Sequence, residues 1–194
     1  MRTGHVVVLV ADVRNYTGMS EVLPNREFSE LMSEWFRQAG DIIKRHNGTI
    51  DKFIGDAVMA SWVVASKSDP SFEVNQALDA ARGLIACAGV FSTRLAAQFP
   101  EHTFRIGVGL NIGEAMLGNV GTAENQSFTV VGDSVNVAFR LEALTKEMKA
   151  PVIASKGIAE CAANEHQFRD LGQATVTGRQ EPVSIWALNL ETGS

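Results

Sequence analysis

Residues 49–62, TIDKFIGDAVMASW, have the pattern of two short strands joined by a tight turn. Apolar residues are frequent in both halves, and the Gly55-Asp56 pair between them is typical of a turn. We therefore expect a β-hairpin with strands over Thr49–Ile54 and Ala57–Trp62. Since a hairpin joins antiparallel strands, this stretch argues against a sheet built only from strand–helix–strand units.

Long helices alternate with further strands along the rest of the chain. Helical spacing of apolar residues predicts one helix from Pro24-Asn25 to Asn47-Gly48, a second over Phe72–Phe99, and a third from Asp133 or Ser134 to about Met148. The other expected strands are His5–Asp12, Phe104–Asn111, Ala115–Val120 and Phe128–Val131, followed by Pro151–Ala154, a short helix capped by Ser155, and short strands near residues 168, 176 and 186. A polar loop is expected after Asp12, and a hairpin tip over residues 121–127. This order predicts an α+β fold: a ferredoxin-like (palm-type) sandwich with a mostly antiparallel central sheet, flanking helices on one face and extra C-terminal strands.

Composition narrows the classes of protein to consider. The 194 residues fit one domain, and the net charge of −5 argues against a nucleic-acid binder driven by a basic surface. Cys87 and Cys161 lie among small apolar neighbours, which predicts buried free thiols in a reducing compartment. No apolar run approaches membrane-spanning length and no signal peptide is evident, so we expect a cytoplasmic domain.

Two aspartates follow apolar, strand-like runs. Asp12 comes after residues 6–11, VVVLVA, and Asp56 lies in the hairpin turn. If the two strands are neighbours, the carboxylates lie close together and could hold Mg²⁺, which takes few protein ligands and completes its shell with water or phosphate. A pair of divalent ions can drive in-line displacement at phosphorus. The alternative is that each Asp is an ordinary turn or cap residue.

A third segment, residues 128–142 (FTVVGDSVNVAFRLE), predicts a strand that turns into a helix at Gly132. Asn136 and Arg140 share one face of that helix, and an amide beside a guanidinium suits a sugar phosphate. The alternative pairs Arg140 with Glu142 or Glu147 and makes Asn136 a cap.

These segments together resemble the catalytic domain of the class III nucleotidyl cyclases, the adenylate and guanylate cyclases. The resemblance is carried, in order, by residues 12–17 (DVRNYT), 52–56 (KFIGD), 118–121 (GNVG) and 129–142 (TVVGDSVNVAFRLE), and it extends over about residues 5–188. It implies a single catalytic domain over residues 1–194. The sequence leaves open whether sensor domains precede it.

The resemblance implies a role for each matching residue. Asp12 and Asp56, with the Val13 carbonyl, would hold two divalent cations (Mg²⁺ or Mn²⁺) that activate the ribose 3′-hydroxyl and hold the triphosphate. Further substrate contacts would come from Gly55 and from the backbone amides of Asn15, Tyr16 and Thr17. Asn136 would orient the ribose, and Arg140 would neutralise charge on the α-phosphoryl group.

The identity of the base depends on Lys52 and Thr129, whose counterparts in the family face the purine edge. Lysine only donates, which suits adenine N1, and the Thr129 hydroxyl can accept from the adenine amino group. Guanine presents a donor at N1, so Lys52 opposes GTP. Threonine at position 129 resembles the class IIIb adenylate cyclases, which allows a response to bicarbonate.

The family works as a dimer with shared sites. Asp12 and Asp56 would come from one chain, and Lys52, Thr129, Asn136 and Arg140 from the other, so a homodimer with two equivalent sites is implied. Two positions depart from the family pattern. Thr177 stands where many members have a phosphate-binding lysine, which Arg179 could replace, and Phe139 stands where smaller residues are commoner.

The sequence therefore predicts an adenylate cyclase that converts ATP to 3′,5′-cyclic AMP and pyrophosphate. Two alternatives stay open: a guanylate cyclase, and a non-catalytic nucleotide-binding module that regulates a partner. A diguanylate cyclase would need a Gly-Gly-Asp/Glu-Glu-Phe hairpin, whereas residues 54–58 are IGDAV.

Overall fold

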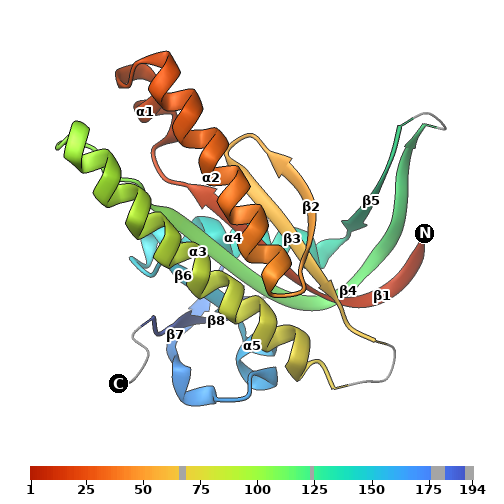
Figure 1. Ribbon diagram of the computed structural model, residues 1–194. Coiled ribbons are helices and arrows are strands. Elements are labelled where there is room, and N and C mark those ends of the chain that lie inside the picture. The colour runs from red at the N-terminus through yellow and green to blue at the C-terminus, as the bar shows by residue number, and fades with distance from the viewer. Residues whose placement is uncertain (66–68, 123–124, 176–181, 191–194) are drawn as a thin grey trace.

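One eight-stranded sheet organises the molecule (Figure 1). The computed structural model describes residues 1–65, 69–122, 125–175 and 182–190, and for residues 120–122 and 125–127 it describes the backbone alone. The strand order is β2-β3-β1-β4-β6-β8-β7, and β5 pairs with β4. Only β4 and β6 pair in parallel among the described strands, so the predicted α+β class with a mostly antiparallel sheet is confirmed. The strands are β1 (Arg2–Val13), β2 (Thr49–Ile54), β3 (Ala57–Val63), β4 (Ile106–Thr122), β5 (Asn125–Val131), β6 (Val152–Ser155), β7 (Phe168–Ala174) and β8 (Val183–Leu188).

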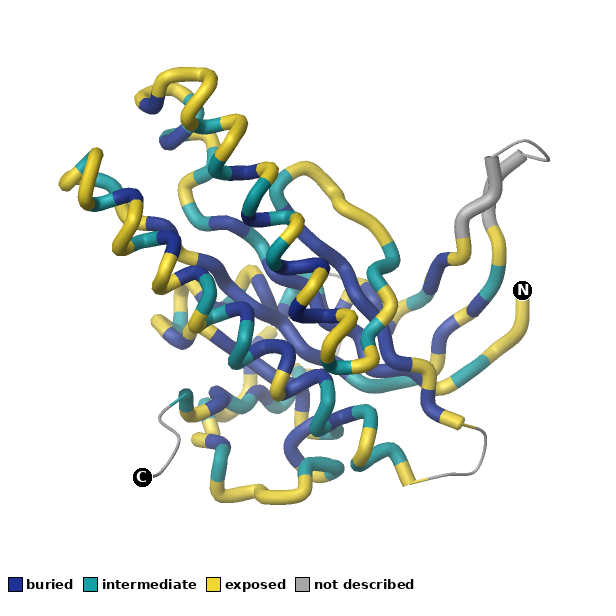
Figure 2. The backbone as a smooth tube through the Cα atoms, viewed as in Figure 1, coloured by how far each residue is buried: buried dark blue, intermediate teal, exposed yellow. Residues whose placement is uncertain are grey.

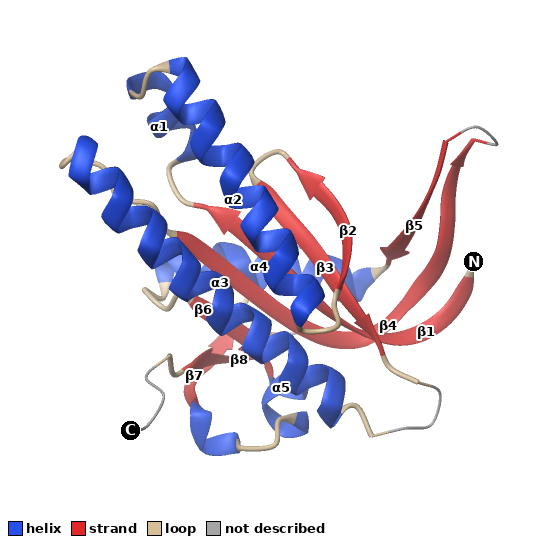
Figure 3. Cartoon of the chain, in the orientation of Figure 1, coloured by secondary structure: helices blue, strands red, loops and turns tan. Residues whose placement is uncertain are grey.

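The helices cover both faces of the sheet, which corrects the expectation of helices on one face. They are α1 (Tyr16–Val22), α2 (Asn25–Arg45), α3 (Ser71–Gln98), α4 (Asp133–Glu147) and α5 (Lys156–Cys161). Side chains alternate along β1: Val7 and Leu9 join the core cluster under α2 and α3, whereas Val6 and Val8 join the cluster under α4. Figure 3 shows α2 and α3 lying across the near face, with α4 behind the sheet. Helices are needed on both faces because every residue from Val6 to Val10 is fully buried, so both faces of the sheet must be covered at β1.

The larger core has an aromatic centre. Trp35 of α2 is fully buried, and its ring lies 5.8 Å from Phe91 and 5.1 Å from Phe104. Figure 2 shows the resulting pattern on α2 and α3, buried toward the sheet and exposed on the outer side. These rings belong to the same core cluster as Val7 and Leu9, so they pack α2 and α3 against the central strand β1.

The predicted break between two strands at residues 112–114 is wrong, because β4 runs unbroken from Ile106 to Thr122. Its far end pairs with β5 and projects from the body of the molecule as a two-stranded arm (Figure 1). The continuous β1 partner, paired from Arg2 to Val13, explains why the strand does not stop at Gly113.

Four smaller expectations concern the loop after Asp12, the strand near residue 176, the two cysteines and membrane-spanning segments. The loop predicted after Asp12 contains a helix, α1, and the strand predicted near residue 176 falls outside the described residues. Cys87 and Cys161 are free thiols as predicted, but they are half-buried rather than buried, and partial burial raises the pKa of both thiols. In the described part of the chain, each helix is too short or too polar to span a bilayer.

Candidate active site

Two acidic side chains meet where β1 ends against the turn between β2 and β3. Asp12 lies opposite Ala57 in the antiparallel register of β1 and β3, and Asp56 directly precedes Ala57. The two carboxyl groups are close enough to share a hydrogen bond. Sheet register, rather than local sequence, therefore brings this pair together.

The surroundings of Asp12 disfavour a negative charge on it. Burial, followed by repulsion from Asp56 and Glu142, raises the pKa of Asp12 to about 7, although Arg14 acts in the opposite direction. Two carboxylates this close are stabilised either by a shared proton or by a cation. Near neutral pH the pair could therefore hold either a proton or a positive ion.

The donor set fits a hard divalent cation. Mg²⁺ is commonly held by one or two carboxylates, with water and substrate phosphate as the remaining ligands. Asp12 and Asp56 supply that number, and no group of three or more His, Cys, Asp or Glu side chains within the described ranges could hold a metal ion instead. An ion at this pair would complete its coordination with water or with substrate phosphate.

The chain turns sharply at Asn15, three residues after Asp12. Asn15 adopts a left-handed conformation, with φ of 58°, and α1 begins at the next residue. The first bond of that turn runs from the Met19 amide to the Asn15 carbonyl, at 2.9 Å. Amides of Tyr16 and Thr17 therefore belong to the first helical turn, where backbone donors have no intrahelical partner.

Lys52 and Thr129 lie beside each other, on two strands that are far apart in the sequence. Both contact Asp51 of β2: the Thr129 Oγ1 atom is 2.7 Å from Asp51 Oδ1, and Lys52 Nζ is 3.9 Å from the same oxygen. Lys52 is partly exposed, with 42% of its side chain accessible, so its ammonium group is available to a ligand. The structure thus brings together the two residues expected to read the base.

Asn136 and Arg140 both lie on α4, as predicted from their spacing. Asn136 is exposed, and Gly132 rather than Asn136 is the N-cap of the helix. Arg140 is partly buried, and its Nη1 atom has no hydrogen-bond partner among the described residues. A buried guanidinium nitrogen without a partner is costly, which is consistent with a group that awaits an anionic ligand.

Glu142 pairs with Arg14, an interaction that the sequence interpretation missed. The Arg14 Nη2 atom lies 2.8 Å from Glu142 Oε1 and 3.1 Å from the Glu142 carbonyl oxygen, and it also contacts the Thr145 hydroxyl. Arg14 thereby ties the end of β1 to α4 across 128 residues of sequence. The sequence signal for it is a basic residue within the segment 12–17, two residues after Asp12, and that signal does not identify the partner.

Phe139 and Thr177 are the two positions that depart from the family pattern, and the structure describes the first of them. Phe139 packs against the cluster formed by β1, β3, β4, β5 and α4, so it fills the sheet–helix interface. Thr177 and Arg179 lie outside the described residues.

Comparisons with known proteins agree with one another. A family model described as "Adenylate and Guanylate cyclase catalytic domain" matches residues 1–189. The chain is 32% identical over 185 residues to Adenylate cyclase 1 of Rhizobium meliloti (strain 1021), covering 93% of this chain and 27% of that protein. It therefore spans about a quarter of that relative's length.

Solved structures show the same fold. The adenylyl cyclase CyaB from P. aeruginosa superposes with a TM-score of 0.86 at 25% identity, covering 96% of this chain and 94% of that chain. The guanylyl cyclase Cya2 superposes with a TM-score of 0.81 at 24% identity, covering 96% and 92% of the two chains. Because the fold matches proteins named for either base, base specificity has to be argued from the side chains.

Proposed function

The chain belongs to the family of adenylate and guanylate cyclase catalytic domains, and we propose that it is an adenylate cyclase that converts ATP to 3′,5′-cyclic AMP and pyrophosphate. Membership makes it a class III nucleotidyl cyclase, a lyase that forms a cyclic nucleotide. The choice of ATP rests on the residues that would face the base, and the geometry at Asp12 and Asp56 supports the chemistry.

The observation that carries the choice of ATP is that Lys52 and Thr129 lie together, each within 4 Å of the same Asp51 oxygen. Adenine has an acceptor at N1 and a donor amino group beside it, whereas guanine has a donor at N1 and an acceptor at O6. The Lys52 ammonium would donate to adenine N1, and the Thr129 hydroxyl would accept from the amino group. With guanine, Lys52 would face a donor, and a donor that the bound base buries without a partner costs about 1–3 kcal/mol.

Asp12 and Asp56 would hold the cations that the family uses. Two bound Mg²⁺ or Mn²⁺ ions would supply Lewis-acid activation of the ribose 3′-hydroxyl and neutralise triphosphate charge. The Val13 carbonyl would be a further ligand, since it directly follows Asp12 at the end of β1. The raised pKa of Asp12, caused first by burial and then by repulsion from Asp56, supports this assignment, because a bound cation would stabilise the negative charge that both disfavour.

Other residues would position the nucleotide. Amides of residues 15–17 and Gly55 would approach the phosphates, and Asn136 would hold the ribose. Arg140 would stabilise the charge that develops on the α-phosphoryl oxygens, a role that fits its unpartnered Nη1 atom. Arg179 would contact the terminal phosphates in place of the family's lysine.

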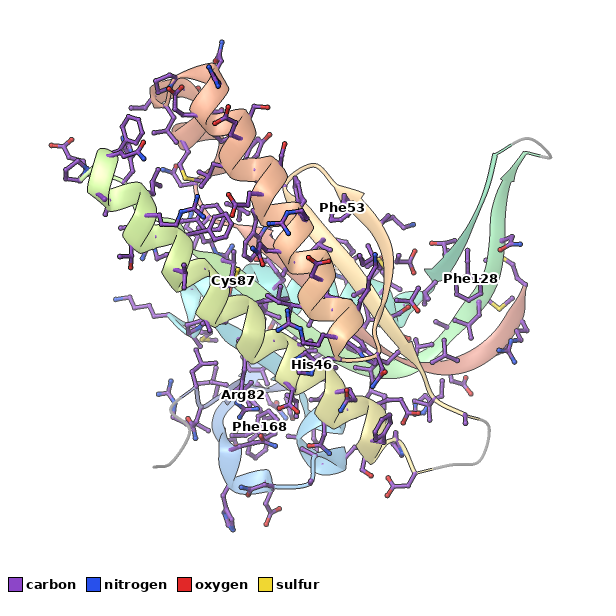
Figure 4. All side chains as sticks on the ribbon, viewed as in Figure 1. His46, Phe53, Arg82, Cys87, Phe128 and Phe168 are labelled. Atoms are coloured by element: carbon purple, nitrogen blue, oxygen red, sulfur yellow. The ribbon has the colours of Figure 1, made fainter. Side chains whose placement is uncertain are left out.

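Each chain would contribute half of two active sites in a homodimer. Apolar side chains are exposed on β2, β4 and β5, beside the base-facing residues: Phe53, Ile54, Met116, Phe128 and Val131, which are 40–48% accessible. Figure 4 labels Phe53 on β2 and Phe128 at the base of the arm. A second copy that covers this surface would shield the apolar groups and complete each site.

The test is a comparison of the two nucleotides. Purified protein with Mg²⁺ or Mn²⁺ should form cyclic AMP from ATP with a kcat/KM about 5- to 150-fold higher than that for cyclic GMP formation from GTP, the ratio that corresponds to 1–3 kcal/mol. Equal or greater activity with GTP would overturn the assignment of the base. If neither nucleotide is converted but both bind, the chain is a non-catalytic nucleotide-binding module.

A further inference from the structure

A buried carboxylate connects the two strands that carry the base-facing residues. The Asp51 side chain is only 1% accessible, although it lies on β2, most of whose residues are exposed. Its Oδ1 atom is 2.7 Å from the Thr129 hydroxyl, and its Oδ2 atom accepts a bond of 3.0 Å from the Val130 amide. These bonds cross from β2 to β5 and join residues 78 and 79 positions apart.

The chemistry of the partners determines the direction of each bond. A backbone amide only donates, so Val130 donates to Oδ2. A carboxylate accepts and does not donate, so the Thr129 hydroxyl must donate its single proton to Oδ1. What remains on Thr129 is a pair of oxygen lone pairs, which can only accept.

We propose that Asp51 is a positioning residue that sets purine specificity, because it makes the Thr129 hydroxyl an obligatory hydrogen-bond acceptor. This inference rests on the proposed function, in which Thr129 faces the base. An acceptor suits the adenine amino group and repels guanine O6. Lys52 lies 3.9 Å from the same Asp51 oxygen, so one carboxylate organises both the donor and the acceptor of the base pocket.

Asparagine at position 51 would reverse the polarity of Thr129. The Val130 amide needs an acceptor, so the Asn oxygen would take that place and its NH₂ group would face Thr129. The Thr129 hydroxyl would then accept from Asn and could donate to guanine O6. We expect Asp51→Asn to lower the ratio of kcat/KM for ATP to that for GTP by about tenfold.

The quantity to compare between variants is the ratio of kcat/KM for ATP to that for GTP. Misfolded molecules convert neither nucleotide, so they lower both values by the same factor and leave the ratio unchanged. Asp41→Asn, which changes an exposed carboxylate on α2, is the matched control and should leave the ratio unchanged. Asp51→Asn/Thr129→Asp should recover the preference for ATP, since a carboxylate at position 129 accepts without help and the Asn amide can donate to it. If Asp51→Asn does not fold, the smaller Asp51→Ser, whose hydroxyl can also donate, should lower the ratio in the same direction.

The outcomes separate this inference from the proposed function. A wild-type protein that prefers GTP, or is inactive, contradicts the proposed function before any variant is made. If the wild type prefers ATP and Thr129→Val lowers the ratio but Asp51→Asn does not, Asp51 has only a structural role. A double variant as unselective as Asp51→Asn would also overturn the relay through Thr129.

Discussion

At Asp12, the local environment works against ionisation. Burial, then Asp56 and Glu142, raises its pKa to about 7, whereas an Asp in an unfolded chain has a pKa of about 3.9. Between these values the folded protein binds a proton that the unfolded chain releases. The resulting stability is fully present below the unfolded pKa and is lost as the pH rises through about 7.

Without divalent ions, the melting temperature should therefore fall as the pH is raised from 5 to 8. Added Mn²⁺ should raise it, and the gain should be larger at pH 8 than at pH 6, because at the lower pH the ion must displace a proton. Scanning fluorimetry in EDTA and in Mn²⁺ measures both effects.

Asp12→Asn provides the residue-level check, because an amide mimics the protonated carboxyl. It should flatten the pH dependence and abolish most of the Mn²⁺ gain, whereas Asp41→Asn should change neither. An unaltered slope in Asp12→Asn would assign the pH dependence to another group.

The position of α4, the helix that carries Asn136 and Arg140, depends on a close approach to β4. A Cβ atom at Gly109 of β4 would lie 2.2 Å from the Ala138 carbonyl oxygen and 2.4 Å from the Glu142 amide nitrogen, both backbone atoms of α4. The helix that carries Asn136 and Arg140 can therefore rest on the sheet only because position 109 lacks a side chain. Arg14 then fastens the same helix to the end of β1.

Gly109→Ala should push α4 away from the sheet and destabilise the protein by about 1–3 kcal/mol, as overpacking typically does. Denaturant unfolding measures the loss, and kcat should fall with it because α4 carries Arg140. Gly89→Ala on α3 is the matched control: nothing lies within 4 Å of its added Cβ atom, and alanine favours helix, so it should be neutral or stabilising. Equal effects of the two changes would contradict the close approach of α4.

For the whole molecule, the central question is whether one chain or two complete a site. Asp12 and Arg140 would belong to opposite halves of a shared site, so Asp12→Ala and Arg140→Ala should each abolish activity. Mixing the two folded variants should restore up to about a quarter of the wild-type activity, because half of the dimers are mixed and each contains one intact site. Activity assays of the mixture, with dimer content measured by sedimentation, test this. If a mixture forms dimers but regains no activity, a shared site is excluded.

Local patterns in the sequence were sufficient for much of this molecule. Turn chemistry at Gly55-Asp56 and helical periodicity from residue 25 onward predicted the hairpin and the long helices, because both signals lie within a few residues. The order of the motifs likewise predicted the cyclase family, and the family model confirms it. The break predicted in β4 was wrong because pairing with β1 outweighs the local preference of Gly113 for a turn.

By itself, the sequence determined which chemical groups are present: two carboxylates after apolar strands, a lysine donor, a hydroxyl, and an amide and guanidinium on one helix. The tertiary structure decided which of them meet. It joined Asp51 to Thr129 and Arg14 to Glu142, and it laid α4 on the second face of the sheet. These outcomes depend on strand register and on packing between segments 78 to 128 residues apart, and interactions over such separations leave no periodic trace in the local sequence.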